Sequence, residues 1–172
     1  EDIGCTKGIE DRVLVLKDGN YRLVDIHGID DFESFSFNNF TNNIDLLNSD
    51  YENPFIYIGK SLSVKLNINL GDFITILMPG HLNLITGLPY KKEMMITGIY
   101  EIEILDYDQK HIFTNYKSIQ EFIPFDRSLI YLNDIPTENF ISSLINKYPL
   151  IKIDTWDNDH SSFISAMRIE KI

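Results

Sequence analysis

Alternating apolar and polar positions predict two neighbouring β-strands near the start of the chain, at residues 12–17 and 21–26. The tripeptide Asp18-Gly19-Asn20 separates them. Because Asp-Gly accepts the positive φ angles of a tight turn, this pattern predicts a β-hairpin. The next stretch, residues 30–53, is polar but carries spaced phenylalanines. It indicates a long connection with one helical turn, anchored by its aromatic rings.

The central part of the chain predicts strands that alternate with short helices. Strands are expected at residues 55–58, 73–78, 93–105, 111–113 and 129–132, and helices at residues 60–66 and 116–123. Pro79 and Gly80 are expected to end one strand. Residues 106–109 are expected to form a turn, where carboxylates such as Asp106 and Asp108 are common.

Helical periodicity dominates the last third of the chain. An apolar stripe repeats at helical spacing after Pro136, which suits a first helical turn. It consists of Phe140, Ile141, Leu144, Ile145 and Tyr148. Residues 150–153 are expected to form a last strand, and the chain from Asp157 onward a last helix. Strands interleaved with short helices predict an α+β domain with a mixed sheet.

Composition narrows the class of partner. The 172 residues carry a net charge of −11, and the lysines and arginines are scattered. Nucleic acid and anionic membrane surfaces would both repel such a chain. The single cysteine, Cys5, has no partner for an internal disulfide. Pro79, Gly80 and Gly87 break the apolar stretch at residues 73–88, so no membrane-spanning helix is expected, and the start without methionine suggests an excised segment.

Motifs for catalysis and metal binding are incomplete. Gly59-Lys60-Ser61 follows a strand, but a phosphate-binding loop needs glycine where Pro54 stands. A calcium loop starting at Asp157 would need glycine where Ser162 stands. The four histidines share no ligand spacing, and no serine-nucleophile or dinucleotide motif occurs. No catalytic residue, cofactor or metal is therefore expected, although an enzyme with a dispersed active site stays an alternative.

One loop departs from the usual polar composition. Residues 79–92 have turn residues at both ends but carry Leu82, Leu84, Ile85, Leu88 and Tyr90. Such a loop either folds back onto the core or projects as a partner-binding arm. Composition alone leaves both alternatives open.

Several short motifs occur in order along the chain. They are His27-Gly28-Ile29-Asp30, Ile58-Gly59-Lys60-Ser61-Leu62, Leu70-Gly71-Asp72, Ile96-Thr97-Gly98-Ile99-Tyr100 and Tyr107-Asp108. The closing stretch adds Trp156, Asn158, Phe163, Met167 and Glu170-Lys171. Over nearly the whole chain, this series resembles the extracytoplasmic domain of the LolC/LolE-type lipoprotein-releasing ABC-transporter permeases.

The resemblance implies one periplasmic domain, residues 1–172, between the first two membrane helices of a permease in the bacterial inner membrane. Its fold would be the α+β, mixed-sheet core of the MacB/LolC/FtsX type, with a second small α/β lobe. Its partners would be a second permease subunit, in a hetero- or homodimer, and a cytoplasmic ATPase. Because that ATPase supplies the energy, the domain itself would not be an enzyme.

The resemblance also assigns roles to two sets of residues. The domain would help extract lipoprotein cargo from the inner membrane and pass it to a LolA-like periplasmic carrier. The carrier would dock on a projecting hook loop within residues 80–92, formed by His81, Leu82, Asn83, Leu84, Ile85, Thr86, Gly87, Leu88, Pro89 and Tyr90. The closing helix would couple membrane-helix motion to the domain through Trp156, Phe163, Met167, Glu170 and Lys171.

The hook departs from the family pattern. The family usually has an arginine before the last proline, whereas Thr86-Gly87-Leu88-Pro89 has none and charge follows only at Lys91 and Lys92. The sequence leaves open whether this is a LolC-type, a LolE-type or a single homodimeric permease. An alternative is the periplasmic domain of a cell-division or exporter-type permease that recruits a different periplasmic partner.

Overall fold

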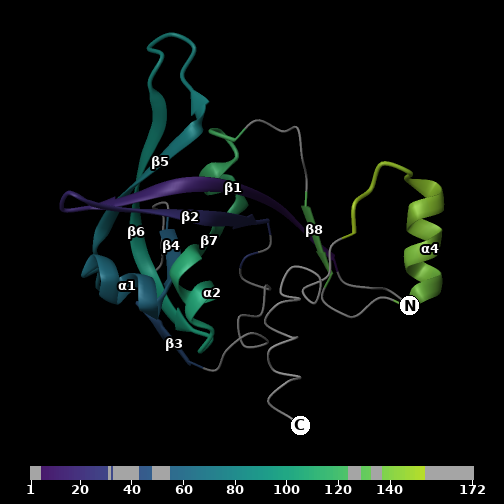
Figure 1. Cartoon of the computed structure of the whole chain (residues 1–172), viewed down its shortest axis with the longest axis horizontal. Helices are drawn as coiled ribbons and strands as arrows, with labels where there is room; N and C mark the ends of the chain where they lie inside the picture. Colours follow the sequence, from purple (N-terminus) through teal and green to yellow (C-terminus); the bar gives the residue numbers. More distant parts are fainter. Residues whose placement is uncertain are drawn as a thin grey trace. The chain divides into compact units, whose positions relative to one another are not determined.

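The computed structural model (Figure 1) describes residues 5–30, 32, 43–47, 55–123, 129–132 and 137–153. The chain divides into two compact units, Glu1–Asn133 and Asp134–Ile172. Among the described residues, no helix has the length and apolar character needed to cross a bilayer.

The first unit is built around an eight-stranded mixed sheet in the described part of the chain. Its strands are β1 (Cys5–Lys17), β2 (Asn20–Ile29), β3 (Asn43–Leu46), β4 (Phe55–Gly59), β5 (Phe73–Leu82), β6 (Pro89–Glu101), β7 (His111–Asn115) and β8 (Leu129–Leu132). Its helices are α1 (Lys60–Leu66), α2 (Leu105–Lys110) and α3 (Tyr116–Ile119). β2 with β7 and β4 with β6 pair in parallel, and the other pairs are antiparallel. The predicted α+β class with a mixed sheet is confirmed.

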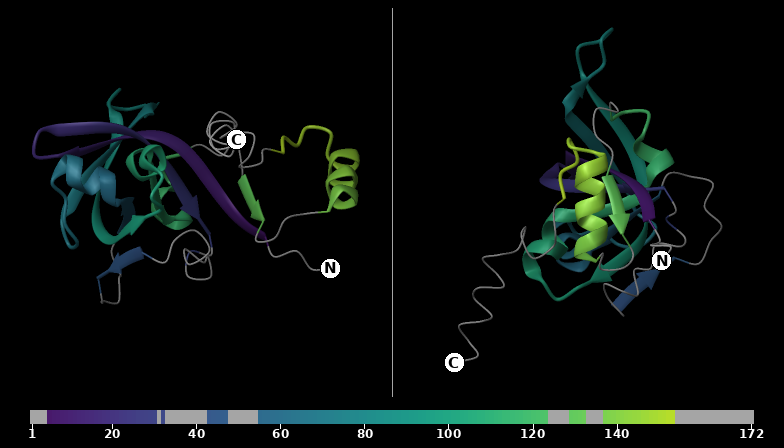
Figure 2. Two further views of the ribbon diagram at one scale, coloured as in Figure 1. Left: turned by 60° about the horizontal axis from the view of Figure 1, so that its bottom comes forward. Right: turned by 90° about the vertical axis from the view of Figure 1, so that its right-hand side faces the viewer.

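Six of these strands close into a ring. Starting at β1, the pairings run through β2, β7, β4, β6 and β5 and return to β1. The closing pairing joins residues 14–16 of β1 to residues 75–77 of β5. β8 pairs with the start of β1, and β3 with the end of β6. The two views in Figure 2 show the same strands from other sides.

The interior of the ring is filled by alternate strand residues, because successive side chains of a strand point to opposite faces. These buried residues include Val13, Val15, Val24, Ile26, Ile56, Ile58, Ile74, Ile76, Met94 and Ile96. Helix α1 adds Leu62 and Leu66, and α3 adds Ile119. β-branched residues dominate the set, as expected for strands packed on one core.

Two local predictions are confirmed. Asp18 and Gly19 have φ angles of 48° and 82°, so a two-residue turn with both angles positive joins β1 to β2. Helix α1 spans the predicted residues 60–66 and ends where Asn67 adopts the left-handed conformation, with φ 50°.

Other predictions are wrong at element ends. Residues 106–109 lie in helix α2 instead of a turn, where the amide of Asp108 donates to the carbonyl of Ile104. Pro79 and Gly80 do not end their strand, because β5 continues through an irregularity in its pairing with β6.

Further differences concern the lengths of elements. β6 begins and ends about four residues earlier than predicted, and α3 has only four residues. β3 occurs inside the stretch predicted as a connection. Residues 150–153 form no strand, and Leu150 is fully exposed.

The described part of the second unit contains one helix, α4 (Glu138–Lys147). The hydroxyl of Thr137 accepts a hydrogen bond from the amide of Phe140 at 3.4 Å and caps the helix start. The predicted apolar stripe lies on this helix except for Tyr148, which is its C-cap, and no residue of the helix is buried.

Candidate functional site

The hook predicted from the sequence, residues 81–90, is the end of the β5–β6 hairpin. This hairpin projects from the ring of strands in Figure 1 and in the right-hand view of Figure 2. Four aliphatic side chains on it are exposed: Leu82 at 53%, Leu84 at 99%, Ile85 at 94% and Leu88 at 65%. The loop that composition left undecided therefore projects instead of folding back onto the core.

The tip of the hook is a compact turn organised by Asn83. Its side-chain oxygen accepts hydrogen bonds from the amides of Ile85 at 2.9 Å and Thr86 at 3.1 Å. Its backbone binds across the turn, to Gly87 at 2.8 Å and Leu88 at 2.9 Å. Gly87 has a φ of 69°, which glycine adopts without strain. These bonds satisfy the backbone within the turn, and Leu84 and Ile85 are exposed on it.

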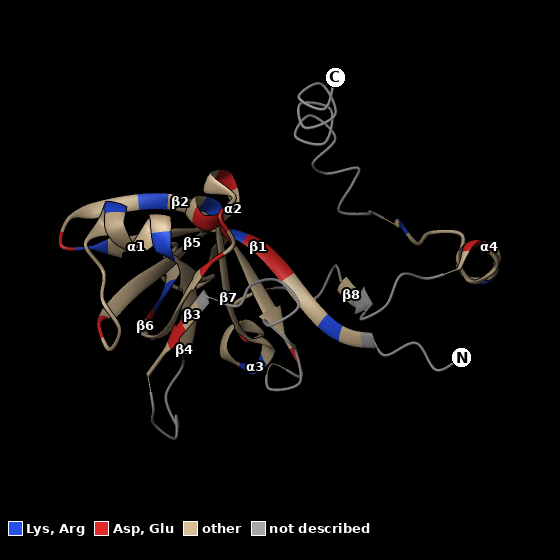
Figure 3. Cartoon of the chain, turned by 90° about the horizontal axis from the view of Figure 1, so that it is seen from below, with Lys and Arg blue, Asp and Glu red and all other residues tan. Residues whose placement is uncertain are grey.

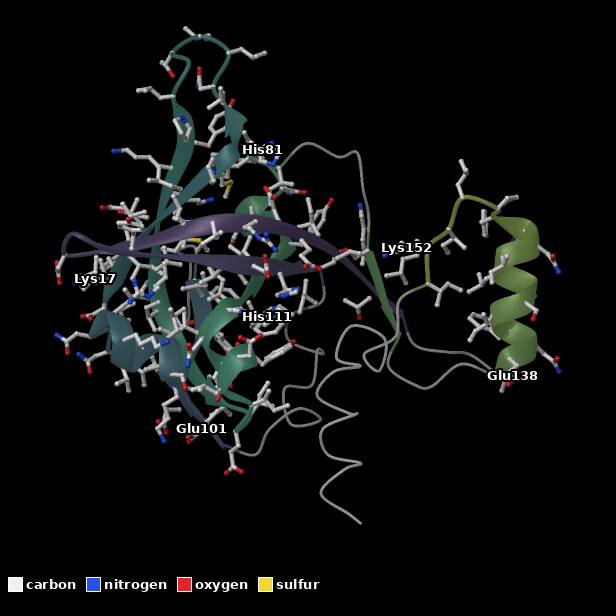
Figure 4. All side chains as sticks on the ribbon, in the orientation of Figure 1. Lys17, His81, Glu101, His111, Glu138 and Lys152 are labelled. Carbon is white, nitrogen blue, oxygen red and sulfur yellow. The ribbon has the colours of Figure 1, made fainter. Side chains whose placement is uncertain are left out.

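The β5 side of the hook begins at a bulge. The regular pairing of β5 with β6 stops at Met78 and Tyr90 and resumes at Leu82 and Pro89. Residues 79–81 are extra on β5, which is how a bulge redirects a side chain. The Nε2 atom of His81 lies 2.7 Å from Oδ2 of Asp11 on β1. Figure 4 shows His81 at the base of the projecting hairpin.

The β6 side of the hook is packed on the turn after α3. The rings of Tyr90 and Phe122 lie 5.7 Å apart, and Tyr90 packs against the buried core. The ammonium of Lys92 donates to the carbonyl of Ser118 at 2.7 Å and lies 4.8 Å from the centre of the Phe122 ring. Burial lowers the pKa of Lys92. Tyr90 thus belongs to the base of the hook, whereas Leu84 and Ile85 form its exposed tip.

The tip differs from the rest of the surface in charge. Residues 82–90 contain no ionisable group except the phenol of Tyr90. Elsewhere acidic and basic side chains are interspersed over the described elements, as Figure 3 shows from below. An uncharged, aliphatic tip suits contact with an apolar protein surface.

A pair of histidines, which the sequence did not single out and of which His27 is buried, lies elsewhere in the same unit. Nε2 of His27 on β2 is 2.9 Å from Nδ1 of His111 on β7. The ring of Tyr107 stacks on His111 at 4.1 Å, and Oε2 of Glu10 is 3.8 Å from Nδ1 of His27. Burial lowers the pKa of His27 to about 3, His111 adds to this, and Asp25 opposes it. At neutral pH His27 is therefore uncharged, and its contact with Glu10 is not an ion pair.

The carboxylates and histidines of the described residues form no metal centre. Within the described ranges, no three His, Cys, Asp or Glu side chains are grouped so as to hold a metal ion. Of the carboxylates predicted in a turn, Asp108 is buried and accepts a hydrogen bond from the amide of Ile102 at 3.0 Å. Burial raises its pKa despite that bond. Asp108 thus organises the chain before α2, which is a structural role.

The second set of predicted site residues lies outside the described residues. Trp156, Phe163, Met167, Glu170 and Lys171 all belong to the stretch after residue 153. Their coupling role stays a prediction from the sequence.

Comparison with known proteins gives matches among solved structures alone. No protein-family model matches the chain, and no curated protein does. The chain is similar to the extracellular domain of the noncanonic ABC-type transporter YknZ from Gram-positive bacteria, with 10% identity and a TM-score of 0.43, over 83% of this chain and 68% of that one. It is also similar to a domain of a permease protein from Porphyromonas gingivalis, with 13% identity and a TM-score of 0.46, over 87% of this chain. The chain spans 64% of the length of that second domain.

Proposed function

We propose that this chain is an extracytoplasmic domain of a lipoprotein-releasing ABC-transporter permease, and that its hook docks a soluble periplasmic lipoprotein carrier. The observation that carries the proposal is the hook itself. By the sequence resemblance it corresponds to the family's docking loop, and it presents Leu84 and Ile85 at 99% and 94% exposure. The lipoprotein cargo, the permease partner, the cytoplasmic ATPase and the location at the inner membrane follow from the sequence resemblance.

The geometry of the tip suits docking without rearrangement. Asn83 fixes the turn, so little chain entropy is lost when a partner binds, and pre-organisation of this kind raises affinity. Burying one side chain the size of leucine contributes about 1.5–3 kcal/mol. Leu84 and Ile85 together therefore supply about 3–6 kcal/mol before the costs of association are subtracted.

A second candidate is a domain of a cell-division or exporter-type permease that recruits another periplasmic protein. The observation that favours it is the absence of arginine from Thr86-Gly87-Leu88-Pro89. An arginine there would supply a charged anchor, and arginine is common among the residues that dominate binding energy. A tip without it relies on aliphatic contacts alone.

The test is a calorimetric titration of the chain with the periplasmic lipoprotein carrier encoded in the same genome. Leu84→Asp combined with Ile85→Asp should weaken binding at least 100-fold, because two carboxylates would be buried in an apolar contact. Leu105→Asp on α2 is the matched control, since Leu105 is 66% exposed but lies away from the hook. Tyr90 is left intact because it packs against the core.

Both outcomes decide between the candidates. Binding that the tip variant loses and the control keeps supports carrier docking through the hook. No binding by the folded wild-type chain contradicts carrier docking and favours the second candidate. Capture of periplasmic proteins on the wild-type chain and on the tip variant would then identify the partner.

A further inference from the structure

The hook is attached to the ring of strands across a break in the sheet. Beyond Met78 and Tyr90, three residues of β5 have no partner on β6 before pairing resumes at Leu82. Gly80 lies in this break, and a side chain added there would meet no atom within 4 Å. The break is therefore open to solvent at Gly80, and pairing with β6 does not hold these three residues.

Contacts on the two sides of the hook differ in kind. The β6 side rests on the packed ring of Phe122 and on the hydrogen bond from Lys92 to Ser118. On the β5 side, the ring of His81 reaches across to the carboxylate of Asp11 on β1. Both side chains are only about one fifth to one quarter exposed, at 22% and 24%. Partial burial strengthens such a contact relative to one in open solvent.

Asp11 is itself held in place. Its other oxygen, Oδ1, accepts a hydrogen bond from the amide of Arg12 at 2.8 Å. The strand that carries it is continuous with the long β1–β2 ladder, in which Asp11 pairs with Ile26. The Asp11 carboxylate is therefore held in place on the ring of strands, and His81, in the break of β5, contacts it.

We propose that the contact between Asp11 and His81 is a latch that sets the direction of the hook, and that Asp11 is a positioning residue for partner docking. This inference rests on the proposed function, because it concerns the same hook. With the latch closed, both sides of the hook are tied to the ring of strands and the tip points one way. With the latch open, the hook pivots at residues 79–81 while its β6 side stays packed.

The effect on docking follows from populations. A partner binds only the hooks that point in the docking direction, so the apparent dissociation constant rises in inverse proportion to their fraction. If the open hook spends about one tenth of its time in that direction, docking weakens about tenfold. The tip residues themselves are unchanged, so their contacts with the partner are kept.

The first experiment measures hook direction without any partner. Spin labels are placed at Thr86 on the tip and at Val64 on α1, with Cys5→Ser removing the native thiol, and electron–electron distances are recorded. We expect one narrow distribution for the parent chain and at least a twofold broader one for Asp11→Ala and for His81→Ala. Asp11→Asn should keep the distribution narrow, since its amide oxygen still accepts from Arg12 and its NH2 group donates to Nε2 of the neutral imidazole.

Asp25→Ala is the matched control. It breaks the neighbouring pair of Arg12 with Asp25, at 3.0 Å on the adjacent strand, and leaves the latch intact. The distribution should stay narrow in this variant. Urea midpoints of all variants verify that each one is folded.

The second experiment titrates the same variants, unlabelled, with the lipoprotein carrier. About tenfold weaker binding by Asp11→Ala, with Asp11→Asn within twofold of the parent chain, supports the positioning role. An unchanged distance distribution in folded Asp11→Ala overturns the latch. A broadened distribution with unchanged carrier affinity overturns the positioning role. A broadened distribution with no carrier binding by any chain, wild type included, supports the latch and contradicts the proposed function instead.

Discussion

His27 should make this domain sensitive to acid. Its imidazole is 7% exposed, hydrogen-bonded to His111 and stacked on Phe113 at 4.9 Å. Burial lowers its pKa to about 3, from an ordinary value of 6.5 in the unfolded chain. Between these values the unfolded state binds a proton at this site and the folded state does not. The free energy of unfolding therefore falls as pH decreases from about 6.5 towards 3.

The size of the effect at pH 5 follows from the two pKa values. Protonation stabilises the unfolded state at pH 5 by RT ln(1 + 10^1.5), which is about 2 kcal/mol. The folded state gains almost nothing, because its pKa lies well below 5. At pH 7.5 the same term is close to zero. His27 alone should thus remove about 2 kcal/mol of stability between pH 7.5 and pH 5.

Urea unfolding at the two pH values measures this loss, and His27→Gln isolates it. Glutamine keeps a polar group beside His111 but does not titrate. With a urea m-value of about 2 kcal/mol per molar, the wild-type midpoint should fall by about 1 M more than the variant's between pH 7.5 and pH 5. The two chains differ only at residue 27, so the difference between the two shifts is due to His27 and its contacts.

Gly80→Ala is the control, since it adds a methyl group in open space and leaves every histidine in place. It should keep the full acid-dependent shift of the wild type. Equal shifts in wild type and His27→Gln would refute the reasoning. That result would mean that His27 takes up a proton in the folded state, for example by forming the ion pair that Glu10 at 3.8 Å allows.

Two further predictions concern a close approach and the tip of the hook. Gly59→Ala should reduce the free energy of unfolding by about 3 kcal/mol, because its methyl group would overlap the backbone of Asp108; in the same urea assay Gly80→Ala, where space is open, should stay within about 0.5 kcal/mol of wild type. Asn83→Ala should leave the urea midpoint unchanged but increase hydrogen exchange at least tenfold at the amides of Ile85 and Thr86, which donate hydrogen bonds to the Asn83 side chain. Unchanged exchange would show that the tip turn holds without that side chain.

The β1–β2 turn and helix α1 were predicted correctly because adjacent residues determine them. Asp18-Gly19 suits positive φ angles at both turn positions, and the turn forms with 48° and 82°. The helix at residues 60–66 likewise forms as predicted, because Asn67 accepts the left-handed conformation that ends it. In both places a few adjacent residues carry the whole signal.

The errors arise where distant contacts decide. Asp106 and Asp108 suit a turn by composition, yet α2 forms because Asp108 is buried and accepts from Ile102, while Glu103 takes a φ of 65°. Pro79 suits the end of a strand, but the bulge on β5 accommodates it and the strand continues. Ile102 is only six residues from Asp108, but the burial of Asp108 and the bulge depend on tertiary packing, which local composition does not encode.

In the candidate site, too, features of local composition were predicted and contacts between distant residues were not. Its apolar loop was visible in composition, because Leu84 and Ile85 are unusual between turn residues. The latch was not visible, because Asp11 and His81 are 70 residues apart and meet only when β5 closes against β1. The histidine pair likewise joins residues 84 apart in sequence.

The motifs that carry the family resemblance have structural reasons. At Gly59 the backbone of Asp108 leaves no space for a side chain, and Gly71 has a φ of 85°. At Gly28 an added Cβ would lie 2.6 Å from Ile119, and at Gly98 it would lie 2.7 Å from the ring of Tyr57.

Core packing and turn geometry therefore require glycine at these positions. Such requirements specify a fold, but they do not determine which partner the protein binds. Partner choice depends on exposed residues that packing leaves free, and in the proposed function those are the tip residues of the hook. The tip is also where the sequence departs from the family pattern, at Thr86-Gly87-Leu88-Pro89. Carrier binding and its loss in the tip variant thus test the part of the resemblance that the motifs leave undecided.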